Sequence, residues 1–519
     1  MTRQPNFNKK NDSDQISDST KVIRLVVEDL KAHFFRNPDG DTFAVCEGRQ
    51  GTREVYRTDS RDFSRWIAWR YYIIHQRALP KQTLLDAIGV LEGRAAFLSP
   101  VEKTFRRVAG LSDKVYIDLC DDRWRVIAVD ATGWQILDKS PINFTRSRAM
   151  LPLPEPQQGS LDYLRDLLNV TDHGWKLTKG LLLGSLNPNG PYPVAVVSGE
   201  QGSAKSTYCE FIRNLIDPNS APLRSVPRSV EELYIAAANS HFTCLDNVSK
   251  VSHPVSDALC RIATGAGTST RKLYSDSDEH ILHLCKPSIL NGIGDLLNNS
   301  DLIDRAIFIE CQPIPEKNRL PRQKVQRLFE AAWPHILGGL LDAVSQAIRE
   351  RENVKDRNWP RMADFAIWVT AGESALNLQP GEFLNLYEAN RAAANSLAIE
   401  NSEAITALVE MIKERTEWTG TASELLEELN ESTDKFRQGK YWPNGPRALA
   451  NLLRRVAPNL RRLGIDTDFP PRTARARRLM LKYRKVASQA SSSPPDDFCD
   501  ASDASDRHSE ALATEGVTQ

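Results

Sequence analysis

Residues 194–207 read VAVVSGEQGSAKST, and their types and spacing suit the binding of phosphate groups. Four apolar residues precede a loop with two glycines, and an amphipathic helical pattern follows until Asp217 and Pro218 end it. In such an arrangement, successive backbone N–H groups and the positive end of the helix face phosphate oxygens. Lys205 would reach the β- and γ-phosphates and the Ser206 hydroxyl would bind Mg²⁺, so we predict a site for ATP with Mg²⁺. The predicted phosphate loop consists of Gly199, Glu200, Gln201, Gly202, Ser203, Ala204, Lys205, Ser206 and Thr207.

Ala204 stands where such a loop ordinarily has the glycine that precedes the lysine. Its methyl group fits if the backbone stays in the right-handed helical region, and Gly202 supplies extra freedom beside it. We therefore expect right-handed backbone angles at Ala204. An ordinary glycine- and serine-rich turn between a strand and a helix is the alternative interpretation.

Three further apolar runs, at residues 242–245, 288–290 and 306–309, have the pattern of buried parallel strands. Ligands of an open parallel sheet bind outside the carboxyl ends of its strands. Asp246 follows the first of these runs, where it would hold Mg²⁺ directly or through water. The alternative is that Asp246 caps a turn.

Asn247 occupies the position at which a glutamate usually polarises the attacking water. Either Asn247 orients the water, or a carboxylate from elsewhere activates it, and Glu200 is then the candidate. Because this group acts on water, the change affects the expected rate of hydrolysis more than the binding of nucleotide.

Two more polar side chains stand beside strand ends. Asn291 follows the run 288–290, where a sensor would hydrogen-bond the γ-phosphate or the attacking water, and an ordinary Asx-turn is the alternative. Arg305 directly precedes the run 306–309. It cannot easily reach its own nucleotide, but in a ring of subunits it would face the γ-phosphate of the neighbour. The alternative is a surface arginine paired with Asp301 or Asp304.

The order of GEQGSAKST, LDNVS, TGAGTSTRKLYSD, ILNGI and DLIDRAIFI resembles the helicase cores of the AAA+ class. It is most similar to superfamily 3 and to the primase-helicases of phages and integrated mobile elements, over about residues 186–320. The resemblance implies an ATP-driven DNA translocase that forms a homo-oligomeric ring, here a hexamer. It assigns Lys205 and Ser206 to the phosphate site, Asp246 to Mg²⁺, Asn291 to the sensor and Arg305 to the finger in trans. Asn247 departs from the acidic pair that is usual in superfamily 3.

Residues 264–274 lie between the second and third predicted strands and contain Arg271, Lys272 and Tyr274. The resemblance implies a hairpin that projects into the central channel of a ring. There the two cations would contact backbone phosphates of DNA and the aromatic ring could stack on a base. A solvated hairpin without this role is the alternative.

Positive charge gathers near the end of the chain, where residues 435–485 contain fifteen Lys or Arg and two Asp. The pattern predicts helices at 421–429 and 446–457, a short run at 460–465 and an Arg-rich wing at 472–483. This order resembles a winged helix-turn-helix, whose second helix enters the major groove of DNA while the wing contacts phosphates. A surface for docking another protein is the alternative. The predicted DNA contacts are Arg454, Arg455, Arg461, Arg462, Arg475, Arg477 and Arg478.

The fold class that we predict is α/β, and a chain of 519 residues is too long for one core. Eight cysteines without a CxxC pair, and no unbroken apolar stretch of about 18 residues, favour a cytoplasmic protein without membrane contact. The predicted segments are a disordered start (1–20), an N-terminal α/β domain of unknown function (21–156), the P-loop core with leading helices (157–320), a helical region (321–415), the winged helix (416–485) and a disordered acidic tail (486–519).

Two functions from different classes fit these features. The first is an ATPase that acts as a DNA translocase or helicase in the replication of a phage or mobile element. The second is a nucleotide-switched DNA-binding initiator or loader, in which Asn247 makes turnover slow. A primase in the N-terminal domain is a third possibility, because residues 115–122 resemble the acidic motif of archaeo-eukaryotic primases, although their spacing differs and no His motif follows.

Overall fold

The computed structural model describes residues 17–249, 251–266, 268–271, 279–282, 284–292, 300–400, 403–434, 442–470 and 478–484. The chain forms two compact units: Met1–Thr406 with Asp434–Trp442, and Ala407–Thr433 with Pro443–Gln519. The predicted disordered tail at 486–519 and residues 1–16 of the predicted disordered start lie outside the described residues. Residues 18–20 begin helix α1 instead, because the Ser17 hydroxyl accepts a hydrogen bond from Thr20 N and caps this helix.

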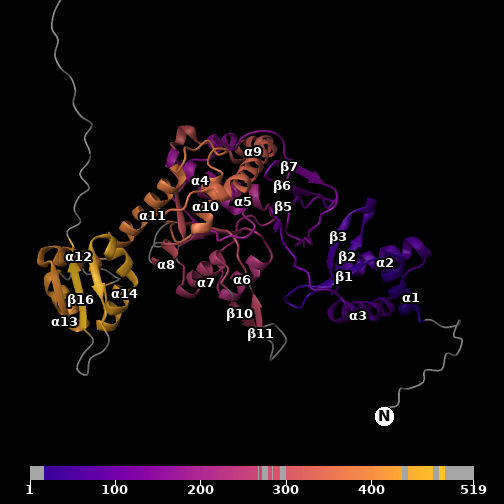
Figure 1. Ribbon diagram of the computed structural model, residues 1–519, viewed down its shortest axis with the longest axis horizontal. Helices are drawn as coiled ribbons and strands as arrows, with labels where there is room; N and C mark the ends of the chain where they lie inside the picture. The colour runs from indigo at the N-terminus through magenta and orange to yellow at the C-terminus, as the bar shows by residue number, and fades with distance from the viewer. Residues whose placement is uncertain are drawn as a thin grey trace, which may run out of the picture. The chain divides into compact units, whose positions relative to one another are not determined.

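The N-terminal part of the first unit has three antiparallel strands in the order β1-β2-β3, packed with helices (Figure 1). Phe34 of β1 packs with Phe63 of α2 and Leu91 of α3 in a core of their own. Neighbouring residues of β1 and β2 are buried on both faces of this sheet, because Phe35 and Phe43 pack in a second cluster with Val55. The elements are α1 (Asp18–Arg24), a π-helix (Leu25–Asp29), β1 (His33–Arg36), β2 (Thr42–Glu47), a 3₁₀ helix (Arg49–Gly51), β3 (Arg53–Arg57), α2 (Arg61–His75) and α3 (Lys81–Leu98).

A four-stranded antiparallel sheet follows, in the order β4-β5-β6-β7. Through Val115, Ile117 and Ile127 it contributes to the same core as the parallel sheet that comes later in the chain. The expected domain at 21–156 therefore does not have one core of its own, and its second half packs with residues beyond 156. The strands are β4 (Val108–Leu111), β5 (Lys114–Asp118), β6 (Val126–Asp130) and β7 (Gly133–Leu137).

The predicted parallel sheet is confirmed, with the strand order β13-β8-β12-β9. Both faces of β8, one of the two inner strands, are buried, which is why its residues Val194, Ala195 and Val197 are all apolar. The strands, β8 (Val194–Ser198), β9 (Thr243–Val248), β12 (Ser288–Gly292) and β13 (Ala306–Glu310), correspond to the four predicted runs. Between and before them lie a 3₁₀ helix (Leu161–Leu167), α4 (Asp172–Ser185), α5 (Lys205–Ile216), α6 (Val230–Ala238), α7 (His253–Thr264), the hairpin β10 (Thr268–Arg271) and β11 (Glu279–Leu282), and α8 (Ser300–Ile303).

The predicted helical region is also present, and its longest described helix lies beside the strands β6 and β7 (Figure 1). Phe329 of this helix, α9, stacks on Phe211 of α5 with ring centroids 4.2 Å apart. Further along α9, Asp342 Oδ1 accepts a hydrogen bond of 3.0 Å from Trp134 Nε1 on β7. The elements are a 3₁₀ helix (Glu316–Asn318), α9 (Arg322–Glu350), a 3₁₀ helix (Arg351–Asn353), α10 (Ala363–Ala371), α11 (Glu382–Glu400) and α12 (Glu403–Arg415).

The second unit has three antiparallel strands in the order β14-β16-β15. Its helices bury Leu425 and Leu429 of α13 and Leu449 and Leu453 of α14. Helix α14 continues five residues beyond the predicted end at 457, so Leu460 is a buried helical residue rather than the start of an extended run. The elements are β14 (Glu417–Thr421), α13 (Ala422–Ser432), α14 (Pro446–Arg462), β15 (Ile465–Asp468) and β16 (Arg478–Tyr483).

A buried ion pair joins the antiparallel sheet to the end of α5. Arg107 Nε lies 3.0 Å from Asp217 Oδ1, and both side chains are completely buried. The other oxygen of Asp217 accepts hydrogen bonds from His241 N and Phe242 N, at 2.8 and 3.2 Å. Burial raises the pKa of Asp217, but Arg107 and Arg213 lower it further, so that it lies below its ordinary value. The carboxylate is therefore charged and fully hydrogen-bonded inside the protein.

Candidate functional site

The predicted phosphate loop connects the end of β8 to the first residue of α5. Gly199 has φ of +143°, and a Cβ atom there would lie 2.5 Å from Cys311 O, so this position requires glycine. Gly202 also has a positive φ, of +81°. No side chain caps α5 at its N-cap residue Ala204. The first N–H groups of α5 are consequently available to an anion.

Ala204 adopts left-handed backbone angles, with φ of 66° and ψ of 27°. The expectation of a right-handed conformation was therefore wrong. Ala204 is the N-cap residue, so the left-handed conformation stands directly before the first residue of α5. For a residue with a Cβ atom it costs about 1 to 2 kcal/mol, which explains why glycine is usual at this position.

Lys205 and Ser206 lie at the start of α5, and both are within reach of the strand ends. Lys205 Nζ donates hydrogen bonds to Gly199 O and Glu200 O, at 2.9 and 2.8 Å. Ser206 Oγ donates to Asp246 Oδ1 at 2.9 Å. The two residues predicted to hold Mg²⁺ are thus in direct contact. In the described part of the chain no three His, Cys, Asp or Glu side chains gather as a metal site, so the phosphates and water would have to complete the coordination of Mg²⁺.

Asn291 links the ends of two neighbouring strands. It lies on β12, beside β9 in the sheet, and its side chain is almost completely buried. Its Nδ2 donates to Asp246 Oδ1, and its Oδ1 accepts a hydrogen bond of 2.9 Å from Asn247 N. Cys209 Sγ on α5 is a further acceptor, 3.6 Å from Nδ2. Asn291 therefore fixes the orientation of the Asp246 carboxylate and the backbone that follows it.

Asn247 is exposed and has a left-handed backbone, with φ of 55°. Asparagine adopts this conformation more readily than glutamate, because its short side chain can hydrogen-bond locally. Glu200, the other candidate for activating water, is exposed on the loop. The backbone angle at 247 gives a physical reason for asparagine in place of the usual glutamate.

Arg305 lies directly before β13, with its side chain 13% exposed. It forms an ion pair with Asp301 and also donates a hydrogen bond of 3.1 Å to Asp301 O. This arrangement is the alternative that the sequence left open. A role as a finger in trans stays a prediction, and it requires the guanidinium to leave Asp301.

Asn169 is a residue of this site that the sequence did not indicate. Its Nδ2 donates to Ser203 O of the loop, at 3.2 Å, and to Gln312 O beyond β13. It therefore connects the phosphate loop to the segment after the neighbouring strand. An isolated Asn before a helix has no pattern that would have revealed this contact.

The predicted DNA contacts are only partly described. Arg271 is a backbone partner of Glu279 in the hairpin β10–β11, whereas Lys272 and Tyr274 lie outside the described residues. In the second unit Arg454 and Arg461 are exposed on α14 and Arg478 is exposed on β16. The side chains of Arg455 and Arg462, and the whole of Arg475 and Arg477, lie outside the description.

Arg447 adds a cation that we had not assigned to DNA. It is exposed at the start of α14, and the spacing of seven residues places it on one face with Arg454 and Arg461. The Arg454 guanidinium also lies over the Phe469 ring, 5.2 Å from its centroid. One face of α14 therefore carries three arginines in a row.

The acidic residues of the antiparallel sheet have structural partners. Asp118 is 1% exposed and forms an ion pair of 2.6 Å with Arg146. Asp121 forms one of 2.6 Å with Arg125. These contacts occupy two of the three carboxylates that gave residues 115–122 their resemblance to a primase motif, and the third, Asp122, is exposed.

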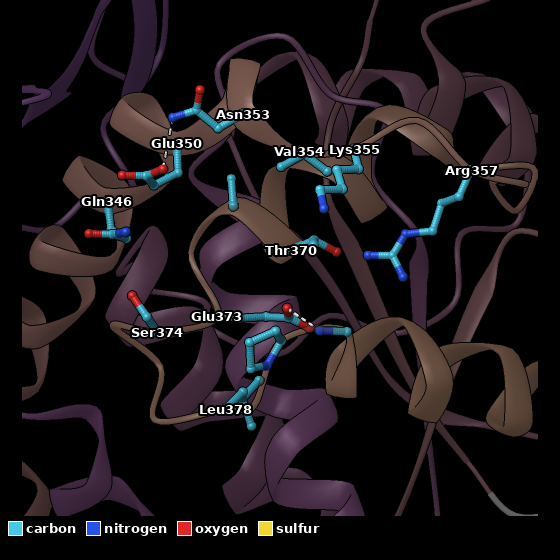
Figure 2. Close-up of a pocket in the computed structure, with 13 residues that line it drawn as sticks. Gln346, Glu350, Asn353, Val354, Lys355, Arg357, Thr370, Glu373, Ser374 and Leu378 are labelled. Atoms are coloured by element: carbon cyan, nitrogen blue, oxygen red, sulfur yellow. Dashed lines mark hydrogen bonds between the residues drawn. The ribbon is translucent and has the colours of Figure 1, made fainter.

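Figure 2 shows a pocket of about 570 Å³ formed by the end of α9, the segment that follows it, α10 and the loop before α11. Within it, Glu373 accepts hydrogen bonds from Gly381 N and Phe383 N, at 2.7 and 2.8 Å, and so caps the start of α11. Burial raises the pKa of this carboxyl. The pocket shares no residue with the predicted phosphate loop. Its lining residues are Gln346, Glu350, Asn353, Val354, Lys355, Arg357, Thr370, Ala371, Glu373, Ser374, Leu378, Pro380 and Gly381.

Taken together, the fold is α/β, with a parallel four-stranded sheet and polar side chains gathered at its carboxyl edge. Residues 161–397 match the family model of the Actinomycete integrative conjugative element replication protein. Residues 404–494 match the model of the AICE RepA C-terminal domain. Over residues 161–397 and 404–494 the chain is thus similar to replication proteins of integrative conjugative elements, and replication of a mobile element is the process that these matches support.

Solved structures of the NrS-1 C-terminal region are also similar to this chain. One, described as the A form apo structure, has a TM-score of 0.40 at 11% identity, and another apo structure has 0.39 at 12%. Each aligns over 90% of this chain and 100% of its own. No curated protein matches the chain. Among the helices that the structure describes, none has the length and apolar character needed to cross a membrane.

Proposed function

We propose that this chain is an ATP-dependent DNA translocase or helicase that serves the replication of an integrative conjugative element. Its core would be a P-loop ATPase of the AAA+ class, similar to superfamily 3. The observation that carries the proposal is the set of hydrogen bonds that joins Ser206, Asp246 and Asn291 beside the N-terminus of α5. A hydroxyl, a carboxylate and an amide thus meet where the phosphates and Mg²⁺ would lie.

The strand order supports this assignment. The phosphate loop follows β8, and β12 separates β8 from β9 in the sheet. Asn291 at the end of β12 is therefore next to both the loop and Asp246, which is where a residue that senses the γ-phosphate is needed. Lys205 would exchange its two carbonyl acceptors in the loop for phosphate oxygens when nucleotide binds.

DNA binding would come from the second unit. Its elements follow the order helix, strand, helix, helix, strand, strand, which is the order of a winged helix, with α14 as the helix for the major groove. The arginines on one face of α14 would contact DNA phosphates there. A ring hexamer, with Arg305 reaching the neighbouring nucleotide, would complete the motor.

Two observations favour the second candidate, a nucleotide-switched initiator or loader with slow turnover. Asn247 provides an amide where a carboxylate would activate water, and Arg305 is held by Asp301. Both features lower the expected rate of hydrolysis without affecting the phosphate loop. ATP would then serve mainly to drive assembly on DNA.

Steady-state ATPase activity, measured with and without single-stranded DNA, separates the two candidates. A translocase should show hydrolysis that DNA stimulates, whereas a loader should bind ATP and turn it over slowly in both conditions. Lys205→Ala should abolish ATP binding in either case while the fold persists, because the hydrogen bonds of Nζ within the described part of the chain go to loop carbonyls. Unchanged ATP affinity in Lys205→Ala would contradict the assignment of the phosphate loop.

A further inference from the structure

Arg319 lies beside the phosphate loop, although it is far from the loop in sequence. A Cβ atom built on Gly202 would have two neighbours within 4 Å, which are Nη2 of Arg319 at 3.5 Å and its Cζ at 4.0 Å. The guanidinium group therefore rests against the loop residue in the middle of the glycine-containing turn. Arg319 belongs to the same subunit, in the segment between β13 and α9.

The backbone that carries Arg319 is fixed on both sides. Before it, the 3₁₀ helix Glu316–Asn318 ends with a hydrogen bond of 3.2 Å from Arg319 N to Glu316 O. After it, Arg322 forms an ion pair of 2.6 Å with Glu210 on α5, and Phe329 stacks on Phe211 of the same helix. Because α5 begins at the phosphate loop, the position of Arg319 relative to the loop is determined by direct packing.

The charge of Arg319 is only weakly neutralised within the protein. Among the described residues its acidic partner is Glu316, whose carboxylate lies 4.0 Å away and is 92% exposed. Such a contact contributes little, because water screens it. By comparison, Arg305 is 13% exposed and closely paired with Asp301.

We propose that Arg319 is a second phosphate-binding cation of this site, acting in the same subunit as Lys205. Its planar guanidinium can donate two hydrogen bonds to phosphate oxygens of a nucleoside triphosphate held by the loop. Glu316 is the partner of this group in the absence of nucleotide, and it would compete with the phosphates when nucleotide binds. The inference rests on the proposed function, because it requires the loop to bind nucleotide.

Equilibrium binding of a fluorescent ATP analogue with Mg²⁺ to the full-length protein tests this inference. Arg319→Ala should weaken binding about tenfold, as expected for a lost charge-assisted hydrogen bond, and Arg319→Lys should weaken it less. Glu316→Gln should strengthen binding, because the competing carboxylate is removed. Arg327→Ala is the matched control: it removes an exposed arginine further along α9, and the affinity should stay unchanged.

The opposite effects of Arg319→Ala and Glu316→Gln distinguish contact with phosphate from a purely structural role, which would give no gain in the second variant. Glu316 is exposed, so this variant remains informative even if Arg319→Ala unfolds. If Arg319→Ala and Glu316→Gln both bind with wild-type affinity while Lys205→Ala loses binding, the role of Arg319 is overturned but the proposed function is not. A wild-type protein that binds no nucleotide would overturn the proposed function as well.

Discussion

At the scale of single residues, two non-glycine positions of the candidate site have a left-handed backbone. Ala204 and Asn247 are both left-handed, with φ of 66° and 55°. Asparagine tolerates this region, whereas alanine does so at a cost. Strain of this kind is retained where the surrounding structure requires it, and both positions flank the place where the γ-phosphate would lie.

Replacing Ala204 by glycine should stabilise the protein by about 0.5 to 1 kcal/mol, because relief of the left-handed strain exceeds the entropy that glycine adds to the unfolded chain. Urea unfolding followed by circular dichroism measures the change. Ala236→Gly, in the interior of α6, is the control and should lose about 1 kcal/mol. A loss of stability in Ala204→Gly similar to the control would show that the alanine is not strained.

At the scale of elements, the sequence was a good guide to the parallel sheet, because strands buried on both faces form continuous apolar runs. The expectation of a right-handed backbone at Ala204 was wrong, because the backbone angles of a loop residue depend on the residues that pack around the loop. The sequence did not predict the contacts of Asn169 and Arg319 with the loop, because both residues belong to segments that are distant from the loop in sequence. The sequence also did not predict that β4–β7 and the parallel sheet share one core. Local periodicity shows which residues of a strand are buried, but not which other element covers them.

The strand β9 begins beside a histidine whose titration should affect folding. Burial lowers the pKa of His241 to about 3 from 6.5, and its Nε2 donates a hydrogen bond of 2.8 Å to Ser185 O. The folded state thus keeps the ring neutral, while the unfolded chain binds a proton below pH 6.5. Stability should therefore fall as the pH decreases from about 6.5 toward 3, by at most about 1.4 kcal/mol per pH unit from this ring.

Urea unfolding of wild type and His241→Gln at pH 7 and pH 5 checks this expectation. Glutamine can still donate to Ser185 O but does not titrate. The loss of stability between the two pH values should be smaller in the variant, by about 1 to 2 kcal/mol. Equal losses in the two proteins would mean that His241 is not the responsible group.

At the scale of the whole molecule, the proposed function depends on two kinds of partner, DNA and further copies of the chain. The affinity of the full-length protein for duplex DNA should fall steeply with salt, because each neutralised phosphate releases counterions. Arg454→Ala with Arg461→Ala should weaken binding and reduce the salt slope. Lys413→Ala, an exposed cation on α12, is the control. Fluorescence anisotropy over a series of salt concentrations measures both quantities, and an affinity independent of salt would favour protein docking.

Mixing of two variants tests whether Arg305 acts between subunits. A Lys205→Ala subunit holds no ATP but keeps its arginine, whereas an Arg305→Ala subunit holds ATP but has no arginine to offer. If Arg305 acts in trans, mixed rings should regain ATPase activity that neither variant has alone. If the arginine only pairs with Asp301, no mixing ratio will exceed the activity of the separate variants.

The ion pair between Arg107 and Asp217 determines where this chain can be shortened. Helix α5 is about 18 Å long by its rise per residue. Its first residues, Lys205 to Thr207, belong to the phosphate loop, and Asp217 directly follows its last residue. A protein that starts at residue 157 would keep every residue of the candidate nucleotide site but would lose Arg107 and the β4–β7 sheet. Asp217 would then be a buried charge without its closest cation, and the apolar residues of the shared core would face water. A truncated protein for biochemical work should therefore retain Arg107 and the β4–β7 sheet.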